Sequence, residues 1–136
     1  IEESCSYIEQ AAKLGLATVF LASPNTPENR LKAIVNKCSG FVYVVSVYGI
    51  TGMRESFENY TVDVIKNIKQ VAGSKIPVAV GFGISNASHI RFMVDAGADA
   101  VIIGSAIVKK IKSNANKEKM LLELCSYIVN LKNACK

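Results

Sequence analysis

The chain has 136 residues, of which 50% are hydrophobic, and its 16 basic and 11 acidic residues give a net charge of +5. This is the size of one ordinary domain with a sizeable core. No apolar run reaches the length of a membrane-spanning helix, and the acidic start at Ile1 lacks the pattern of a signal peptide. We therefore expect no membrane association. Since no initiator methionine is present, we expect either processing or a larger parent protein.

The basic residues of the last third are spread along helical stretches and are not interleaved with aromatic residues. We therefore expect no nucleic-acid partner. The four cysteines form no C-x-x-C pair, and the single histidine, His89, is distant from all of them in the sequence. This spacing argues against a metal site and favours reduced, mostly buried cysteines in a cytoplasmic protein.

In chain order, the first half predicts an amphipathic helix over 2–14, a strand over 17–22, a helix ending near residue 37, a strand over 41–46 and a loop over 47–56. Gly15 suits the end of the first helix as its C′ residue. Thr26 is expected to be the N-cap of the second helix, with Pro27 at its first helical position.

The second half predicts a helix over 60–71, a strand over 76–80, a helix over 86–96, a strand over 100–103 and helices over 105–111 and 117–131. Asn86 is the expected N-cap of the second of these four helices. Gly73 and Gly97 are expected to end the helices that precede them.

Two segments of this half, residues 77–85 and 98–108, share one pattern. Each is a β-branched run that stops at glycine and continues into a helix, and Gly83 and Gly104 are 21 residues apart. Glycine permits close approach of the backbone to a ligand, and a helix start supplies free N–H groups and a positive dipole end. The loops after strands 7 and 8 of a (β/α)8 barrel often bind phosphate in this way. The pattern therefore predicts a phosphate site.

Four buried-type strands alternating with helices predict a parallel α/β arrangement with right-handed crossovers. A (β/α)8 barrel needs about 250 residues, so 136 residues correspond to about half of one. We expect residues 1–136 to form a single partial domain, the C-terminal half of a TIM barrel. A small open doubly wound sheet is the alternative, although the chain lacks the Gly-rich first turn that such sheets use for dinucleotides.

Several motifs, taken together and in order, resemble the tryptophan synthase alpha chain family, over essentially the whole chain. They are Phe20-Leu-Ala-Ser-Pro-Asn-Thr-Pro27, Gly40-Phe-Val-Tyr-Val-Val-Ser46, Gly49-Ile-Thr-Gly52, Gly81-Phe-Gly-Ile-Ser85 and Gly104-Ser-Ala-Ile-Val-Lys109. The resemblance implies strands 5 to 8 of that family's barrel. It also implies cleavage of indole-3-glycerol phosphate to indole and glyceraldehyde 3-phosphate. The expected partner is the beta chain in an α2β2 complex. Pyridoxal phosphate belongs to that partner, and no cofactor or metal is expected here.

The resemblance also implies a set of substrate-binding residues. The phosphate would be bound by Gly52, Gly83, Gly104 and Ser105, and the rest of the substrate would be contacted by Tyr43, Thr51, Gly81, Phe82 and Ile102. Thr51 belongs to a loop that closes over the site in the family. Tyr43 would support catalysis by donating to a catalytic carboxylate, and its alternative role is that of a core aromatic.

Two departures limit the resemblance. Val47 stands where many family members have a basic residue. The family's acid–base glutamate and aspartate belong to the other half of the barrel, so we expect no catalytic residue here and no activity from the chain alone. Glu55, Glu58 and Asp99 are expected to be solvated or structural, and His89 to be a surface residue away from the site. The alternatives are a half-barrel that self-associates as an assembly module and another phosphate-binding barrel enzyme of the histidine or tryptophan pathways.

Overall fold

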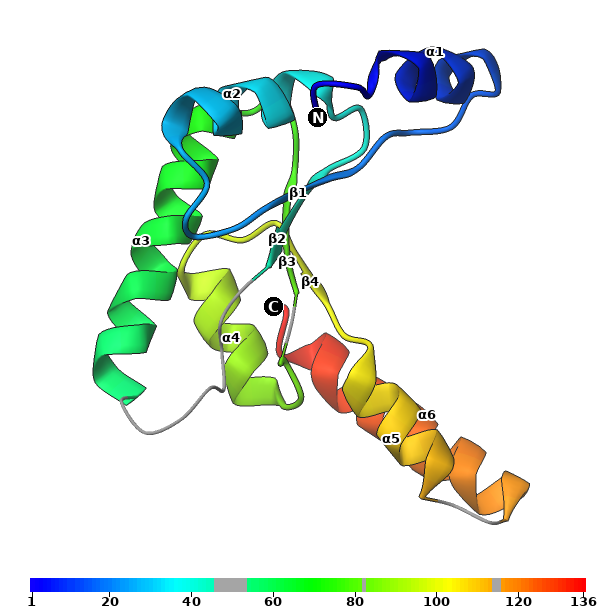
Figure 1. Cartoon of the computed structure of the whole chain (residues 1–136). Coiled ribbons are helices and arrows are strands. Elements are labelled where there is room, and N and C mark those ends of the chain that lie inside the picture. The colour runs from blue at the N-terminus through cyan, green and yellow to red at the C-terminus, as the bar shows by residue number, and fades with distance from the viewer. Residues whose placement is uncertain (46–53, 82, 114–115) are drawn as a thin grey trace.

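The computed structural model describes residues 1–45, 54–81, 83–113 and 116–136 (Figure 1). Within these ranges the chain alternates helices and strands, as predicted. The elements are α1 (Cys5–Lys13), β1 (Phe20–Ala22), α2 (Glu28–Lys37), β2 (Val42–Val45), α3 (Arg54–Ala72), β3 (Val78–Gly81), α4 (Ala87–Asp95), β4 (Ala100–Ile102), α5 (Ser105–Lys112) and α6 (Lys117–Asn133).

The four strands form one parallel sheet in the order β1-β2-β3-β4. Val44 of β2 pairs with Ala22 on one side and with Val80 on the other, and Val80 pairs in turn with Val101 of β4. Each strand therefore lies beside the next one in the sequence, with a helix between them. This sequential order is that of a (β/α) barrel wall and differs from the reversed order at the centre of a doubly wound sheet.

One face of the sheet is covered by α2, α3 and α4 (Figure 1). The valines that point to this face, among them Val42 and Val80, are at most 1% exposed, and Ile65 of α3 and Met93 of α4 are fully buried against them. Burying such a side chain contributes about 1.5–3 kcal/mol. The hydrophobic core of the chain is therefore the layer between these three helices and the sheet, joined by Leu131 and Ala134 at the end of α6.

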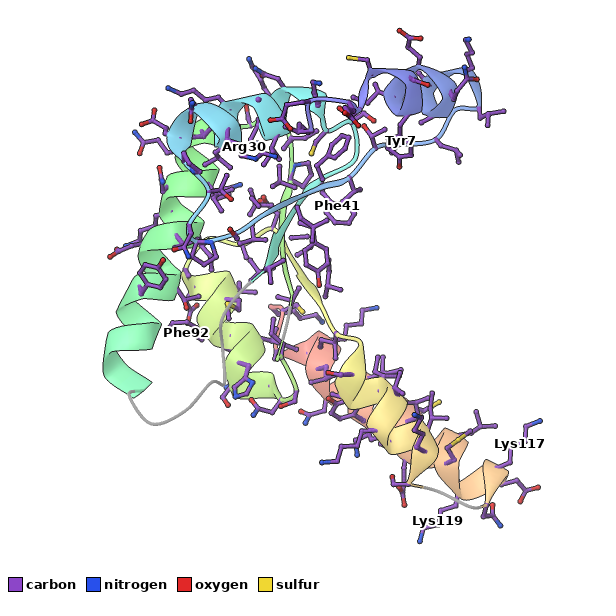
Figure 2. The ribbon with its side chains drawn as sticks, viewed as in Figure 1. Tyr7, Arg30, Phe41, Phe92, Lys117 and Lys119 are labelled. Carbon is purple, nitrogen blue, oxygen red and sulfur yellow. The ribbon has the colours of Figure 1, made fainter. Side chains whose placement is uncertain are left out.

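In the parts of the chain that the structure describes, no helix packs over the opposite face of the sheet (Figure 1). Leu21 of β1 points to this face and is 63% exposed, and the side chain of Phe41 lies on the same side of the strands in Figure 2. The helices α1 and α5–α6 extend away from the sheet (Figure 1), and α1 buries only Ala11. The sheet thus has one face covered by helices and one open apolar face.

The ends of the helices agree only in part with the sequence predictions. Gly15 and Gly97 end their helices with φ of 67° and 103°, as expected. The prediction that Thr26 caps α2 is wrong, because its Oγ1 accepts a hydrogen bond from the N–H of Ser23 at 2.9 Å. Pro27 takes the N-cap position, with no side-chain hydrogen bond there. The helix α3 begins at Arg54, earlier than expected, since no glycine or proline interrupts residues 54–60.

The cysteines also differ from the prediction. All four are free, but only Cys38 is buried, whereas Cys5, Cys125 and Cys135 are exposed. The expectation of mostly buried cysteines is therefore wrong. Cys5 of α1 and Cys125 of α6 lie on exposed faces of their helices. In the parts of the chain that the structure describes, no helix has both the length and the apolar character needed to cross a membrane.

Candidate functional site

The carboxyl ends of β3 and β4 lie side by side. Gly81, the last residue of β3, pairs with Ile102, the last residue of β4. Because the strands are parallel, the turns that follow them emerge at the same edge of the sheet. These turns carry Gly83 and Gly104, so the structure brings the two predicted glycine segments to one place.

The first of these turns leads from β3 into α4. Gly83 has a φ of 75°, a left-handed conformation that favours glycine, and it is exposed, whereas Ile84 beside it is 2% exposed and anchors the turn in the core. The side chain of Asn86 caps α4, as predicted, by accepting a hydrogen bond from the N–H of His89 at 2.9 Å. The buried side chain of Ile84 and the helix cap of Asn86 thus fix the conformation of the turn.

The placement of His89 differs from the sequence expectation. Its Nδ1 accepts a hydrogen bond from the N–H of Ser85 at 3.4 Å, and its side chain is partly buried. The residue lies in the first turn of α4, next to the turn at the carboxyl end of β3. The expectation that His89 lies away from this end is wrong, because a helix that follows a strand begins at the strand's carboxyl end. The hydrogen bonds of His89 are exposed, as expected for a surface residue.

The second turn leads from β4 into α5. Gly104 is the N-cap residue and Ser105 the first residue of the helix, and both are exposed. The carbonyl of Gly104 accepts hydrogen bonds from the N–H groups of Ile107 and Val108 at 3.0 and 3.1 Å. The first N–H groups of a helix precede its hydrogen-bond ladder, and the dipole there attracts anions. This end of α5 therefore suits a negatively charged ligand.

Tyr43, Gly81 and Ile102 come together on the open face, next to the two turns. A Cβ atom added at Gly81 would collide with the hydroxyl of Tyr43, would lie 2.7 Å from its Cζ and would lie 3.2 Å from the Cβ of Ile102. The phenol of Tyr43 therefore lies directly over Gly81, toward the carboxyl end of the sheet. Its ring lies on the open face, outside the core under α2, α3 and α4.

Other predicted site residues cannot be placed in this way. Thr51, Gly52 and Phe82 lie outside the residues that the structure describes. Val47 and the glycine at position 49 also fall in that segment.

Asp99 lies at the opposite, amino-terminal end of β4. Its carboxylate accepts hydrogen bonds from Lys69 Nζ at 2.7 and 2.8 Å and from the N–H of Val78 at 2.7 Å. Burial opposes ionisation of this carboxyl most strongly, but Lys69 and the Val78 N–H outweigh it and lower the pKa of Asp99. As expected, Asp99 is a structural residue, because it joins α3 to the sheet far from the two glycine turns.

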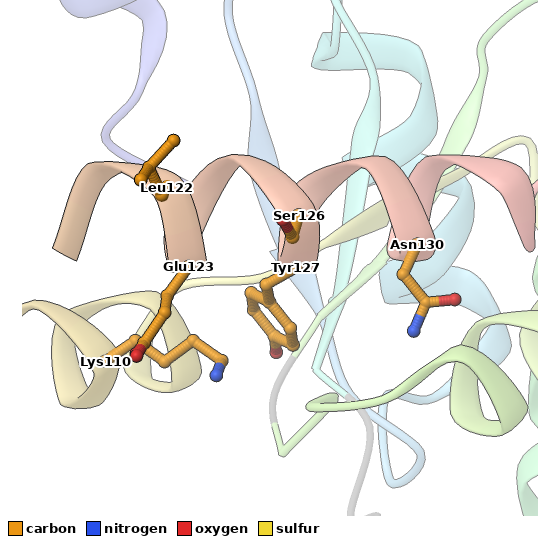
Figure 3. A pocket seen from close by; sticks show the side chains of 6 residues that line it. All are labelled: Lys110, Leu122, Glu123, Ser126, Tyr127 and Asn130. Carbon is orange, nitrogen blue, oxygen red and sulfur yellow. The ribbon is translucent and has the colours of Figure 1, made fainter. Parts of the chain in front are cut away.

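The sequence reasoning missed two residues beside the site. The hydroxyl of Tyr127 on α6 donates a hydrogen bond to the carbonyl of Ser85 at 2.7 Å, and Lys110 Nζ lies 4.7 Å from the centre of the Tyr127 ring. Both residues line an open groove of about 470 Å³ between α5 and α6 (Figure 3), together with Leu122, Glu123, Ser126 and Asn130. The only local signal for Tyr127 is an aromatic on an otherwise ordinary amphipathic helix, which does not reveal its partner.

No group of three His, Cys, Asp or Glu side chains suitable for a metal ion occurs among residues 1–45, 54–81, 83–113 and 116–136. The site described above thus consists of backbone turns, one serine hydroxyl and one phenol. Such donors suit a phosphorylated ligand.

The sequential parallel sheet, with helices on one face and glycine turns at its carboxyl edge, defines the molecule as part of a (β/α) barrel. A family model described as "Tryptophan synthase alpha chain" matches residues 1–136. The chain belongs to the tryptophan synthase alpha chain family.

Individual relatives agree with this assignment. The chain is 46% identical over 124 residues to a tryptophan synthase alpha chain of Methanococcus maripaludis, covering 91% of this chain and 47% of that protein. It is 48% identical over 117 residues to the corresponding protein of Methanocaldococcus jannaschii, covering 86% of this chain and 41% of that protein.

Solved structures show the same correspondence. The alpha subunit of the Pyrococcus furiosus tryptophan synthase a2b2 complex aligns with a TM-score of 0.80 at 34% identity, covering 97% of this chain and 50% of that one. A structure of the A-subunit from the same organism aligns with a TM-score of 0.81 at 36% identity. The alignment covers 97% of this chain and 51% of the A-subunit. The chain therefore spans about half the length of the proteins that it matches.

Proposed function

We propose that the chain supplies the phosphate-binding half of a tryptophan synthase alpha chain, a lyase that cleaves indole-3-glycerol phosphate to indole and glyceraldehyde 3-phosphate. The observation that carries the proposal is the meeting of the Gly83 turn and the Gly104–Ser105 helix start at one edge of the sheet, next to Tyr43. In this proposal residues 1–136 are a single partial domain, the second half of a TIM barrel.

The proposed roles follow from the donors that each residue offers. The backbone N–H groups of Gly83 and Gly104 and the hydroxyl of Ser105 bind the phosphate, since these groups lie where anions are stabilised. Tyr43 and Ile102, separated by the bare backbone of Gly81, contact the part of the substrate that lies over the open face. Phe82, Thr51 and Gly52 complete the set by family resemblance alone.

The acid–base chemistry requires groups that this half does not provide. Cleavage needs proton transfer at the indole ring and at the glycerol hydroxyl. Asp99 is engaged at the opposite end of the sheet, and Tyr43 brings a phenol and no carboxylate to the site. We therefore propose that the first half of the barrel supplies both catalytic carboxylates and that the isolated chain is inactive.

The proposed protein partner is a tryptophan synthase beta chain, which consumes the indole with the help of its own pyridoxal phosphate. This rests on family membership and on the matching structure from Pyrococcus furiosus, which is described as an a2b2 complex. The proposed location is the cytoplasm, and cell fractionation with an antibody to this chain would test it.

The test is the release of indole from indole-3-glycerol phosphate by the chain alone and by the chain mixed with the N-terminal half of a relative. Activity only in the mixture supports the proposal, and Ser105→Ala should then raise the KM of the mixture. Activity of the chain alone contradicts the proposed source of the carboxylates. Inactivity of both samples, without phosphate binding by the chain, contradicts the proposal as a whole.

A second candidate function is an assembly module in which the half-barrel associates with itself. The exposure of Leu21 on an uncovered sheet face favours it, because such a face promotes association. The mass in solution distinguishes the two functions: a doubled mass together with inactivity in the mixture supports the module. Family membership gives no support to a different phosphate-binding enzyme of the histidine pathway.

A further inference from the structure

Tyr127 connects α6 to the turn that follows β3. Its hydroxyl donates a hydrogen bond to the backbone carbonyl of Ser85 at 2.7 Å, although the two residues are 42 positions apart. Ser85 lies two residues after Gly83, in the turn that forms one side of the proposed phosphate site. The hydrogen bond therefore restrains that turn from outside its own strand–helix unit.

The same side chain also contacts α5. Lys110 Nζ lies 4.7 Å from the centre of the Tyr127 ring, a cation–π arrangement (Figure 3). The helix α5 begins at Ser105, which forms the other side of the proposed site. Tyr127 therefore contacts the two separate elements that carry the phosphate-binding groups, one through its hydroxyl and one through its ring.

The surroundings of the phenol favour a lasting contact. Burial raises the pKa of Tyr127, so the hydroxyl remains protonated and able to donate at neutral pH. The ring is partly buried and packs against the core cluster. The hydrogen bond itself is exposed to solvent, so the contacts of the ring with the core cluster and with Lys110 hold the hydroxyl in place.

Phosphate binding by two turns depends on the distance between them. Backbone N–H groups bind an oxyanion well only when they are held close to the required geometry by surrounding contacts. The two turns are joined at their strand ends by the pairing of Gly81 and Ile102, but beyond this point each turn continues into a different helix. A residue that contacts both elements thus controls their relative position.

We propose that Tyr127 is a positioning residue of the phosphate site, which holds the Gly83–Ser85 turn through its hydroxyl and α5 through the contact of its ring with Lys110. The inference rests on the proposed function, since it concerns the same site. Tyr127 itself is not required to touch the ligand.

The test compares the full chain with its Tyr127→Phe variant, which removes only the hydroxyl. Inorganic phosphate is titrated while the backbone amides of Gly83 and Gly104 are followed by NMR, and amide hydrogen exchange is measured at residues 83–85. Loss of one hydrogen bond predicts phosphate binding about fivefold to tenfold weaker and faster exchange in the turn.

Two control variants separate positioning from general stability. Tyr7→Phe makes the same chemical change on the exposed helix α1, and Leu131→Val removes one methylene group from a buried side chain of α6. The first should change neither measurement. The second should lower the melting temperature at least as much as Tyr127→Phe but leave phosphate affinity and exchange in the turn unchanged.

A further variant, Lys110→Met, removes the cation above the ring and keeps most of the side chain. It should weaken phosphate binding by a smaller factor, and it keeps the inference testable if Tyr127→Phe does not fold. Phosphate affinity and turn exchange in Tyr127→Phe equal to those of the unchanged chain would overturn the inference. If the unchanged chain binds no phosphate, the exchange rates alone decide whether Tyr127 positions the turn. The proposed function then fails only if the mixture with the N-terminal half also releases no indole.

Discussion

The two faces of the sheet are covered to different extents. Four valines of β2 and β3 point to the face covered by α2, α3 and α4, and each is at most 1% exposed: Val42, Val44, Val78 and Val80. Val45 points to the other face, as Tyr43 does. On that open face Leu21 is 63% exposed. The covered face therefore supplies the stability of the chain, and the open face carries Tyr43 and Ile102 of the candidate site. The residues that stabilise the fold and the residues of the candidate site therefore lie on different faces of the sheet, and substitutions on each face test this separation.

The largest expected effect is on the covered face. Ile65→Ala removes a fully buried side chain of α3 and should lower the free energy of unfolding by about 2–5 kcal/mol, since the lost burial adds to the cavity left behind. Urea unfolding followed by circular dichroism measures this loss. A change below about 1 kcal/mol would mean that the helix layer is not the core of the chain.

Gly81→Ala tests the close contact between Tyr43 and the backbone of β3 on the open face. The added Cβ would collide with the hydroxyl of Tyr43, so we expect a loss of about 1–3 kcal/mol from forced rearrangement. The double variant Gly81→Ala, Tyr43→Leu should be less destabilised than the sum of the two single changes, because the obstructing ring is absent. Strict additivity in urea unfolding would contradict the placement of Tyr43 over Gly81.

Asp99→Asn tests an ion pair at the amino-terminal end of β4, at the opposite end of the sheet from the site. Because the folded-state pKa of Asp99 is lowered, its contribution is present above the pKa of the unfolded chain, about 3.9. The contribution disappears as the pH falls through the lower folded value. The side chains of Asp99 and Lys69 are 39% and 30% exposed, so we expect a loss of only about 0.2–1 kcal/mol at pH 7.

Urea unfolding of both proteins between pH 7 and pH 2.5 measures this contribution. The difference between the two stability curves should be constant near neutral pH and should shrink toward zero in acid. A difference that grows as the pH falls would have the wrong sign for a lowered pKa.

The smallest effect is expected on the open face. Leu21→Ser should change the stability of the isolated chain by no more than about 0.5 kcal/mol, because the side chain is already in water. The same variant should weaken assembly with the N-terminal half of a relative, measured by the concentration of chain needed for half-maximal indole release. Equal assembly of both proteins would show that Leu21 is not covered in the joined barrel.

Much of the site was predictable because its features are local. The stop at glycine after each β-branched run predicted strand ends at residues 80 and 103, each within one residue of the observed ends at Gly81 and Ile102. Parallel strands must also end at the same edge of the sheet. The cap at Asn86 and the closing glycine at Gly97 were also predictable, since each depends on a few neighbouring residues. Thr26 shows the limit of such rules, because its hydroxyl bonds to the preceding turn instead.

The alternation of strands and helices, the parallel half-barrel and the position of the glycine turns were therefore determined by the sequence alone, through local periodicity and backbone preference. The tertiary structure decided the contacts between distant elements. Tyr127 bonds to Ser85 across 42 positions, and Lys69 bonds to Asp99 across 30. The physical reason is that such contacts depend on how each helix is rotated and displaced against its neighbours, and this is set by the packing of the whole core and not by any single stretch of residues.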